Sequence, residues 1–286
     1  MAENALTGVC VGSAALGMRP ILIHHRIDFV LLTMDQLINH AAKWKPMFGG
    51  QQSVPMVIRA VVGRGWGNGP QHTQSHHALF SHVPGIKTVV PANARDAKGL
   101  LLAAVADDDP VVYIEHRWLH EDEAEVPSEY FTTPIGRAAV VRRGRDVTIV
   151  AAGPMVSEAL KAAHALETSG IIAEVVDLRT LHPLDTSTVV ESVRRTGRLV
   201  VADSDWAPCG IAAEVIARVA EEALDVLRSR PVRVTWPDSA VPSSQAIEPM
   251  FYPGAREIQI AAAALCEGRV SQRLVTSTVR DFHGPF

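Results

Sequence analysis

The chain has 286 residues, a formal net charge of −4 and three cysteines, and 47% of its residues are hydrophobic while only 5% are aromatic. Such a length predicts two domains, and the absence of a Lys/Arg-rich block argues against nucleic acid as a partner. No apolar run approaches the roughly 18 residues of a membrane span, and the start lacks a secretory signal. We therefore expect no membrane partner, no disulfide framework and a reducing cytoplasm as the location.

The first forty residues predict a helix, a strand and a second helix. Small residues run from Thr7 to Gly17, a composition that lets a helix approach neighbouring backbone closely. Pro20 ends this helix, and Ile21–Ile23 is a short apolar strand. Residues 29–42 then return to helical spacing.

The rest of the first half alternates strands and helices. Strands are expected at 21–23, 54–62, 88–90, 111–115 and, more weakly, near the start, with helices at 29–42, 76–82 and 93–106. Such alternation favours a parallel sheet with helices on both faces. A polar, Glu-rich stretch follows, and we place a linker at 121–137 between a first domain at 1–120 and a second at 138–266.

The second half repeats the alternation. Strands are expected at 146–152, 172–176, 198–202 and 232–235, and helices at 156–169, 186–196, 210–226 and 255–265. The predicted fold class is therefore α/β, with two doubly wound domains in series. Residues 267–286 form a tail to which the sequence assigns no role.

Ten short motifs occur in an order that resembles a known protein family. They are AENALTG at 2–8, GMRP at 17–20, IDF at 27–29, MDQLINHAAK at 34–43, MFGG at 47–50, VPMVIR at 54–59, QHTQ at 71–74, HVPG at 82–85, DAKGL at 96–100 and DLRTLHPLD at 177–185. In this order they resemble the β subunit of the thiamine-diphosphate-dependent 2-oxo acid dehydrogenase E1 component, which is transketolase-like. The resemblance implies a pyrimidine-binding thiamine-diphosphate domain followed by a transketolase C-terminal-like domain.

The resemblance assigns chemistry to three residues. Glu3 matches the carboxyl group that hydrogen-bonds N1′ of the cofactor's aminopyrimidine, a bond on which proton removal by the cofactor depends. Phe29 matches the aromatic side chain that packs on that ring, and His72 matches an active-site histidine that stabilises an oxyanion or transfers a proton. Position alone would instead favour a solvated Glu3, a core Phe29 and a structural His72.

The basic run His24, His25 and Arg26 departs from the family pattern, which is apolar at this strand end. Basic side chains there fit contact with an anionic or hydroxylated substrate, and they fit a solvated strand end equally well. The departure argues against a simple pyruvate or branched-chain substrate.

A second group of residues matches family positions that hold a monovalent cation, with K⁺ as the candidate ion, largely through backbone oxygens. These residues are Met56, Ala104, Asp107 and Asp109. The run 107–110 is explained just as well as a turn that ends a helix.

Two family features are absent from the sequence. The Gly-Asp-Gly segment, which with a later Asn binds Mg²⁺ and the cofactor's diphosphate, does not occur, and no Walker-type loop replaces it. We expect an α-type partner to hold Mg²⁺ and diphosphate, so that the active site lies between chains of an α2β2 assembly. The family also has a segment ahead of the residue that matches Glu3, and we expect a further chain or an upstream start to supply it, or else a degraded site.

The predicted function is that of a β-type subunit that, with its partner, decarboxylates a 2-oxo acid or cleaves a ketose and transfers the acyl or ketol fragment. A lipoamide acceptor would define a dehydrogenase, and an aldehyde or sugar acceptor a transketolase-like or acyloin-forming carboligase. A non-catalytic subunit that stabilises an active partner is the alternative of another class. A free-standing flavodoxin-like module would explain the alternation but not the ordered motifs.

Overall fold

A computed structural model describes residues 2–63 and 67–268 of the chain. These residues fold into two compact units, each assembled from more than one segment. The first unit holds the residues up to Gly63, Gln74–Arg137 and Arg179–Leu184. The second holds the stretch that ends at Thr73, Ala138–Leu178 and the residues from Asp185 onward. Apart from residues 267 and 268, the expected tail lies outside the described residues.

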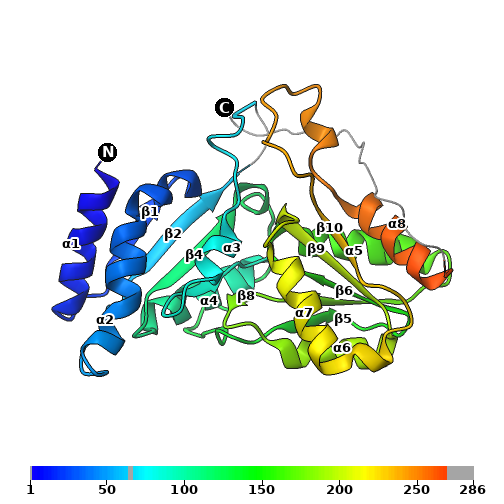
Figure 1. Cartoon of the computed structure of the whole chain (residues 1–286), viewed down its shortest axis with the longest axis horizontal. Coiled ribbons are helices and arrows are strands. Elements are labelled where there is room, and N and C mark those ends of the chain that lie inside the picture. The colour runs from blue at the N-terminus through cyan, green and yellow to red at the C-terminus, as the bar shows by residue number, and fades with distance from the viewer. Residues whose placement is uncertain (1, 64–66, 269–286) are drawn as a thin grey trace. The chain divides into compact units, whose positions relative to one another are not determined.

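The first unit contains a five-stranded sheet in the order β1-β2-β4-β3-β8 (Figure 1). Its strands are β1 (Ile21–His24), β2 (Val57–Val62), β3 (Lys87–Val89), β4 (Val111–His116) and β8 (Thr180–His182). The first four pair in parallel, which confirms the predicted parallel sheet. Strands β2 and β4 are buried along nearly their whole length, which explains their continuous apolar runs.

The sequence predicts a fifth strand near the start of the chain, and this prediction is wrong. Residues Glu3–Ala15 form helix α1, and β8 takes the fifth place, antiparallel to β3. Arg179 secures the return of the chain, because its guanidinium pairs with Asp96 at 2.8 Å and its carbonyl accepts a hydrogen bond from Val90 at 2.7 Å. Three residues are too few to show an apolar alternation, so distant pairing defines this strand.

Helices of several kinds surround the first sheet. They are α1 (Glu3–Ala15), α2 (Ala42–Met47), α3 (His77–Ser81) and α4 (Ala94–Ala106), together with 3₁₀ turns at Ile27–Thr33 and Arg117–Leu119 and a π-type turn at Asp35–Ala41. The predicted helix at 29–42 is thus helical but changes its winding. Thr33 contributes to this, because its hydroxyl donates to the Val30 carbonyl at 2.7 Å and competes with the α-helical pattern.

The second unit contains a five-stranded sheet in the order β10-β9-β6-β7-β5. Its strands are β5 (Ala139–Arg142), β6 (Val147–Ala151), β7 (Ala173–Asp177), β9 (Leu199–Trp206) and β10 (Val232–Trp236). Four of them pair in parallel as predicted. The edge strand β5, which the sequence did not predict, pairs antiparallel with β7.

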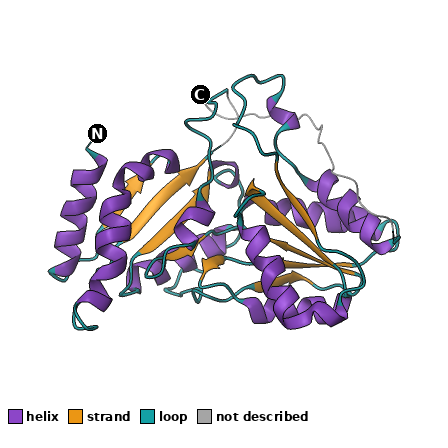
Figure 2. Cartoon of the chain, viewed as in Figure 1, coloured by secondary structure: helices purple, strands orange, loops and turns teal. Residues whose placement is uncertain are grey.

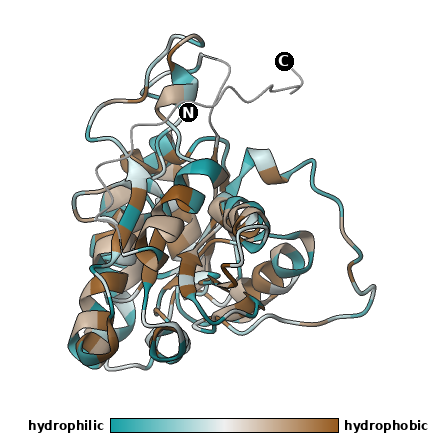
Figure 3. Cartoon of the chain, turned by 90° about the vertical axis from the view of Figure 1, so that its right-hand side faces the viewer, coloured by the Kyte–Doolittle hydropathy of each residue, from teal (hydrophilic) through white to brown (hydrophobic). Residues whose placement is uncertain are grey.

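The helices of the second unit cover both faces of its sheet (Figure 2). They are α5 (Pro154–Glu167), α6 (Thr186–Thr196), α7 (Ile211–Ala223) and α8 (Ala255–Cys266), with 3₁₀ turns at Leu224–Val226 and Glu248–Met250. Helix α5 packs with α8 and α6 packs with α7. Hydrophilic and hydrophobic residues alternate along the helices (Figure 3), as expected for helices with one face on a buried sheet. No helix in the described ranges is both long and apolar enough to cross a membrane.

Gly85, in the turn before β3, packs directly against the backbone at the start of α2 and has no space for a side chain. Gly85 has a φ of +97°, and a Cβ atom built on it would lie 2.1 Å from the Ala42 carbonyl oxygen. Both features require glycine, because the left-handed conformation and the contact with backbone each exclude a side chain. The turn before β3 and the start of α2 therefore depend on this residue.

We predict that Gly85→Ala lowers the free energy of unfolding of the first unit by roughly 2–4 kcal/mol, because both the overlap and the conformation become unfavourable. Gly50→Ala is the matched control, since Gly50 also has a positive φ, +80°, but would meet nothing within 4 Å. It should cost about 1 kcal/mol. Urea unfolding of both variants measures the difference, and equal losses would show that the contact with Ala42 has no energetic role.

Candidate functional site

Polar residues gather at the carboxyl edge of the first sheet. Strands β1, β2 and β4 are parallel neighbours, with His24 opposite Ala60 and Val62 opposite His116. Their carboxyl ends therefore meet at one edge, which is where ligands bind in open α/β sheets. The residues at or just after these ends include His24, Arg26, Gly63 and Arg117.

Glu3 and His24 interact electrostatically at this edge. Glu3 lies half-buried in the first turn of α1, where the Thr7 hydroxyl donates to its carbonyl at 2.8 Å. His24 is only 7% exposed, and its Nε2 atom has no hydrogen-bond partner among the described residues. Burial lowers the pKa of His24, and the Glu3 carboxylate opposes that effect. A neutral imidazole with an unused buried nitrogen is suited to bind a polar atom of a ligand.

Asp28 and Phe29 lie in the 3₁₀ turn that follows β1. Asp28 is 8% exposed, and its Oδ1 atom accepts hydrogen bonds from the Gln74 main chain at 3.3 Å and from Gln74 Nε2 at 2.9 Å. Its Oδ2 atom has no partner within the described part of the chain. Phe29 is 40% exposed, so it is not a core residue. An aromatic face at the surface is suited to stacking on a flat ligand.

Arg26, Gly63 and Arg117 meet beside these residues. A Cβ atom on Gly63 would lie 2.4 Å from Arg26 Nη1 and 3.1 Å from Arg117 Cδ, so both side chains approach the Gly63 backbone. The sequence prediction singled out Arg26 as a substrate-pocket candidate but gave Arg117 no role at the site. Arg117 lies near the end of the predicted first domain, and its position directly after a buried strand was a usable signal.

The two remaining predicted site residues are His25 and His72. His25 is exposed. His72 belongs to the second unit, where its main-chain N–H donates to the Gly69 carbonyl at 3.4 Å. The structure thus brings Glu3, His24, Arg26 and Phe29 to one region of the first unit, and a shared role for His72 stays a prediction.

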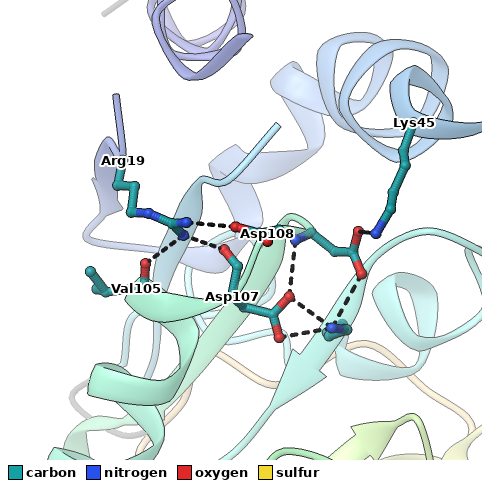
Figure 4. A network of polar contacts seen from close by, with 7 residues as sticks. Arg19, Lys45, Val105, Asp107 and Asp108 are labelled. Atoms are coloured by element: carbon teal, nitrogen blue, oxygen red, sulfur yellow. Dashed lines mark hydrogen bonds and ion pairs between the residues drawn. The ribbon is translucent and has the colours of Figure 1, made fainter. Parts of the chain in front are cut away.

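Lysine side chains neutralise the two aspartates predicted to line a cation site (Figure 4). Lys87 Nζ lies 2.7 Å from Asp107 Oδ1 and 3.2 Å from Asp109 Oδ2, and Lys45 Nζ lies 2.8 Å from Asp109 Oδ1. Burial raises the pKa of Asp109, but these two ammonium groups outweigh it and leave the pKa below its ordinary value. Any cation here would therefore bind main-chain oxygens rather than these carboxylates.

The main-chain oxygens of this region are also partly engaged. Arg19 Nη1 donates to the carbonyls of Val105 at 3.0 Å and Asp107 at 2.7 Å (Figure 4). The Met56 carbonyl accepts a hydrogen bond from Val111 at 3.0 Å. Within residues 2–63 and 67–268, no three His, Cys, Asp or Glu side chains gather as a metal-binding group.

Two known domain families match this chain, one over the region of each sheet. Residues 1–121 match the transketolase pyrimidine binding domain, and residues 136–258 match the transketolase C-terminal domain. The fold and the site at its carboxyl edge thus define a transketolase-type α/β protein. A solved structure described as a split gene transketolase, an inactive β4 tetramer, is similar with a TM-score of 0.77 and 28% identity, over 93% of this chain and 82% of that one.

Similar proteins of known function identify the branch of this class to which the chain belongs. The chain is 46% identical to the β subunit of an acetoin:2,6-dichlorophenolindophenol oxidoreductase of Cupriavidus necator, over 94% of this chain and 79% of the relative. It is 41% identical to a mitochondrial pyruvate dehydrogenase E1 component subunit beta-2 of rice, over 92% of this chain and 71% of the relative. The chain belongs to the family of β subunits of thiamine-diphosphate-dependent 2-oxo acid dehydrogenase E1 components, as the sequence motifs predicted.

We predict that His24 makes the stability of the chain depend on pH. Because burial holds its folded-state pKa below its ordinary value, the folded state binds fewer protons than the unfolded state as the pH falls below about 6.5. Stability is therefore lost from that pH down through the depressed pKa, and the loss stops growing below it. His24→Gln removes the titrating group and should give a flatter curve of unfolding free energy against pH.

The exposed neighbour provides the control for this prediction. His25→Gln also removes a histidine beside β1, and its curve should follow that of the wild type, as measured by urea unfolding between about pH 7.5 and 5. Parallel curves for the wild type and His24→Gln would contradict the assignment of a buried neutral His24.

Proposed function

We propose that this chain is the β-type subunit of a thiamine-diphosphate-dependent enzyme acting on a 2-oxo acid, with an active site shared with an α-type subunit. The observation that carries the proposal is the placement of Glu3, His24 and Phe29 together at the carboxyl edge of the first sheet. Family membership and the names of the relatives, which are β subunits of acetoin and pyruvate enzymes, support it.

The residues at this edge fit the pyrimidine half of the cofactor. An aminopyrimidine offers a flat face and a row of ring and amino nitrogens, which match the exposed Phe29 ring, the Glu3 carboxyl and the unused Nε2 of His24. When bound, thiamine diphosphate supplies the carbon nucleophile that attacks a carbonyl group.

Each of the predicted site residues would have a distinct role. Glu3 would hold a proton at the pyrimidine nitrogen N1′. Phe29 would orient the ring and exclude water from its face. His24, kept neutral by burial, would hydrogen-bond the substrate without adding charge, and His72 would hold or transfer a proton at the substrate oxygen. His25 is exposed and would contact substrate only at its entrance.

An α-type partner would complete the site. The sequence has no Gly-Asp-Gly segment, so the partner would hold Mg²⁺ and the diphosphate, in an α2β2 assembly. The exposed apolar side chains of α1, the connection that follows it, β1 and the next 3₁₀ turn support burial by another polypeptide, whether the partner or a further chain. These side chains are Leu6, Val9, Leu16, Met18, Ile21, Ile23, Leu31 and Leu32. A K⁺ ion on the main-chain oxygens of Met56, Ala104, Asp107 and Asp109, and a cytoplasmic location, stay predictions.

The acceptor is the feature that separates the candidate reactions. A lipoyl-bearing domain added to the assembled enzyme, thiamine diphosphate and a 2-oxo acid should become reductively acylated if the enzyme is a dehydrogenase of the relatives' kind. Product formation only with an added aldehyde would instead identify a carboligase.

We predict that Glu3→Gln lowers turnover of the assembled enzyme by at least about 100-fold, because an amide cannot supply the proton that the pyrimidine nitrogen needs. Calorimetry of thiamine diphosphate with the wild-type chain alone and mixed with the α-type partner should show binding only in the mixture. Asp35→Asn is the charge-matched control, since Asp35 is on the same unit and bonds Asn39 rather than facing the site. Full activity of Glu3→Gln, or no cofactor binding in any mixture, would sink the proposal.

A further inference from the structure

The segment that carries His72 has no regular secondary structure and is held by side-chain hydrogen bonds. Residues 71–76 form neither a helix nor a strand, so regular main-chain pairing does not position them. The next residue, Thr73, is fully buried, and its hydroxyl donates to the Gly69 carbonyl at 2.5 Å. Two residues beyond the histidine, Gln74 donates to the Asp28 carboxylate. Hydrogen bonds of the two residues that follow His72 therefore position this part of the chain.

Asp28 accepts from both donors of Gln74. Its Oδ1 atom lies 3.3 Å from the main-chain nitrogen of Gln74 and 2.9 Å from Nε2. Asp28 is only 8% exposed, and hydrogen bonds to an ionised, buried acceptor are stronger than those between neutral groups in water. The two residues are 46 positions apart in the chain, so this contact joins the turn after β1 to the segment before α3.

The two ends of this contact lie close in the chain to two predicted site residues. Asp28 immediately precedes Phe29 in the 3₁₀ turn Ile27–Thr33. At the other end, each residue extends the chain by at most about 3.6 Å, so the Cα atom of His72 lies within roughly 7 Å of the Cα atom of Gln74. One carboxylate therefore links the turn that bears Phe29 to a chain position two residues from His72.

We propose that Asp28 is a positioning residue, which holds His72 in the place where it acts by binding Gln74. The inference rests on the proposed function, because it concerns how the histidine of that site is held. A displacement of about 1 Å at a reacting group is enough to cost roughly 100-fold in rate. Two hydrogen bonds to one carboxylate can therefore control a step in which that carboxylate takes no part.

The first test removes the acceptor. We expect Asp28→Ala to lower kcat of the assembled enzyme by roughly 100-fold, while KM and the Kd for thiamine diphosphate change by less than about 3-fold. Asp28→Asn keeps an oxygen for Gln74 and places its amide nitrogen where Oδ2 has no partner among the described residues, so it should retain most of the activity. Gln74→Met removes only the side-chain donor and should give an intermediate loss, and it carries the same test if Asp28→Ala does not fold.

A matched control separates positioning from stability. Asp185 is 6% exposed, and its carboxylate also accepts from main-chain nitrogens, those of Thr188 at 3.1 Å and Ala138 at 3.0 Å. Asp185→Ala should therefore destabilise the chain but leave kcat per folded enzyme unchanged. A loss of kcat as large as that of Asp28→Ala would overturn the proposal, because loss of any buried carboxylate would then have the same effect.

A double-mutant cycle shows whether Asp28 acts through the histidine. In an enzyme that already carries His72→Ala, Asp28→Ala should lower kcat no further. Losses that multiply would overturn the proposal, because Asp28 would then act on another group. An Asp28→Ala variant whose main defect is weaker thiamine diphosphate binding would also overturn it and would assign the effect to Phe29.

Hydrogen exchange keeps this inference distinct from the proposed function. In the complete chain without cofactor, the Gln74 amide should exchange at least about 10-fold faster in Asp28→Ala than in the wild type, as followed by NMR. Asp185→Ala should leave that rate unchanged. This result together with no cofactor binding in any mixture would leave the anchor standing and remove the proposed function. An unchanged exchange rate in Asp28→Ala would remove the anchor alone.

Discussion

The parallel pairing of β1, β2 and β4 is the constraint on which the candidate site depends. The register that sets His24 opposite Ala60 and Val62 opposite His116 brings three separate chain segments to one edge. Side chains alternate between faces along a strand, so a shift of one residue would turn His24 to the other face. The burial of β2 and β4 on both faces makes any change of register costly, because closely packed side chains would lose their neighbours on both sides of the sheet. Core packing thus fixes the geometry of the polar edge.

The sequence predicted long, buried elements well and short or remotely paired ones poorly. The helix at Ala94–Ala106 was predicted, and in the structure the side chain of Asn93 caps it by accepting a hydrogen bond from the Asp96 main chain at 2.9 Å. Strand β8 was missed because three residues carry no pattern, and its place depends on the ion pair of Arg179 with Asp96, 83 positions away. The site divides in the same way. Motif order identified Glu3 and Phe29, whereas Arg117 belongs to none of the family motifs, and the strand order shows that it lies beside Arg26.

The two edges of the first sheet differ in how their polar groups are satisfied. At the amino edge, Lys87 begins β3 and holds Asp107, which lies just before β4, with two hydrogen bonds of 2.7 Å. At the carboxyl edge, buried atoms of His24 and Asp28 lack partners among the described residues. Buried polar groups are normally satisfied, and each exception carries a free-energy cost. The amino edge therefore stabilises the fold by pairing its charges, whereas His24 Nε2 and Asp28 Oδ2 at the carboxyl edge are available to a ligand.

The polar side chains at the carboxyl edge form two neighbouring groups. Glu3 faces a histidine whose neutrality is maintained by burial, an arrangement suited to an uncharged heterocycle with several hydrogen-bonding nitrogens. Arg26 and Arg117 both approach the Gly63 backbone on the same edge. Both groups include residues of one short segment, because His24, Arg26 and Asp28 are every second residue of the chain as it leaves β1. One short segment after β1 therefore brings an unused imidazole nitrogen, a guanidinium group and a carboxylate anchored by Gln74 to this edge.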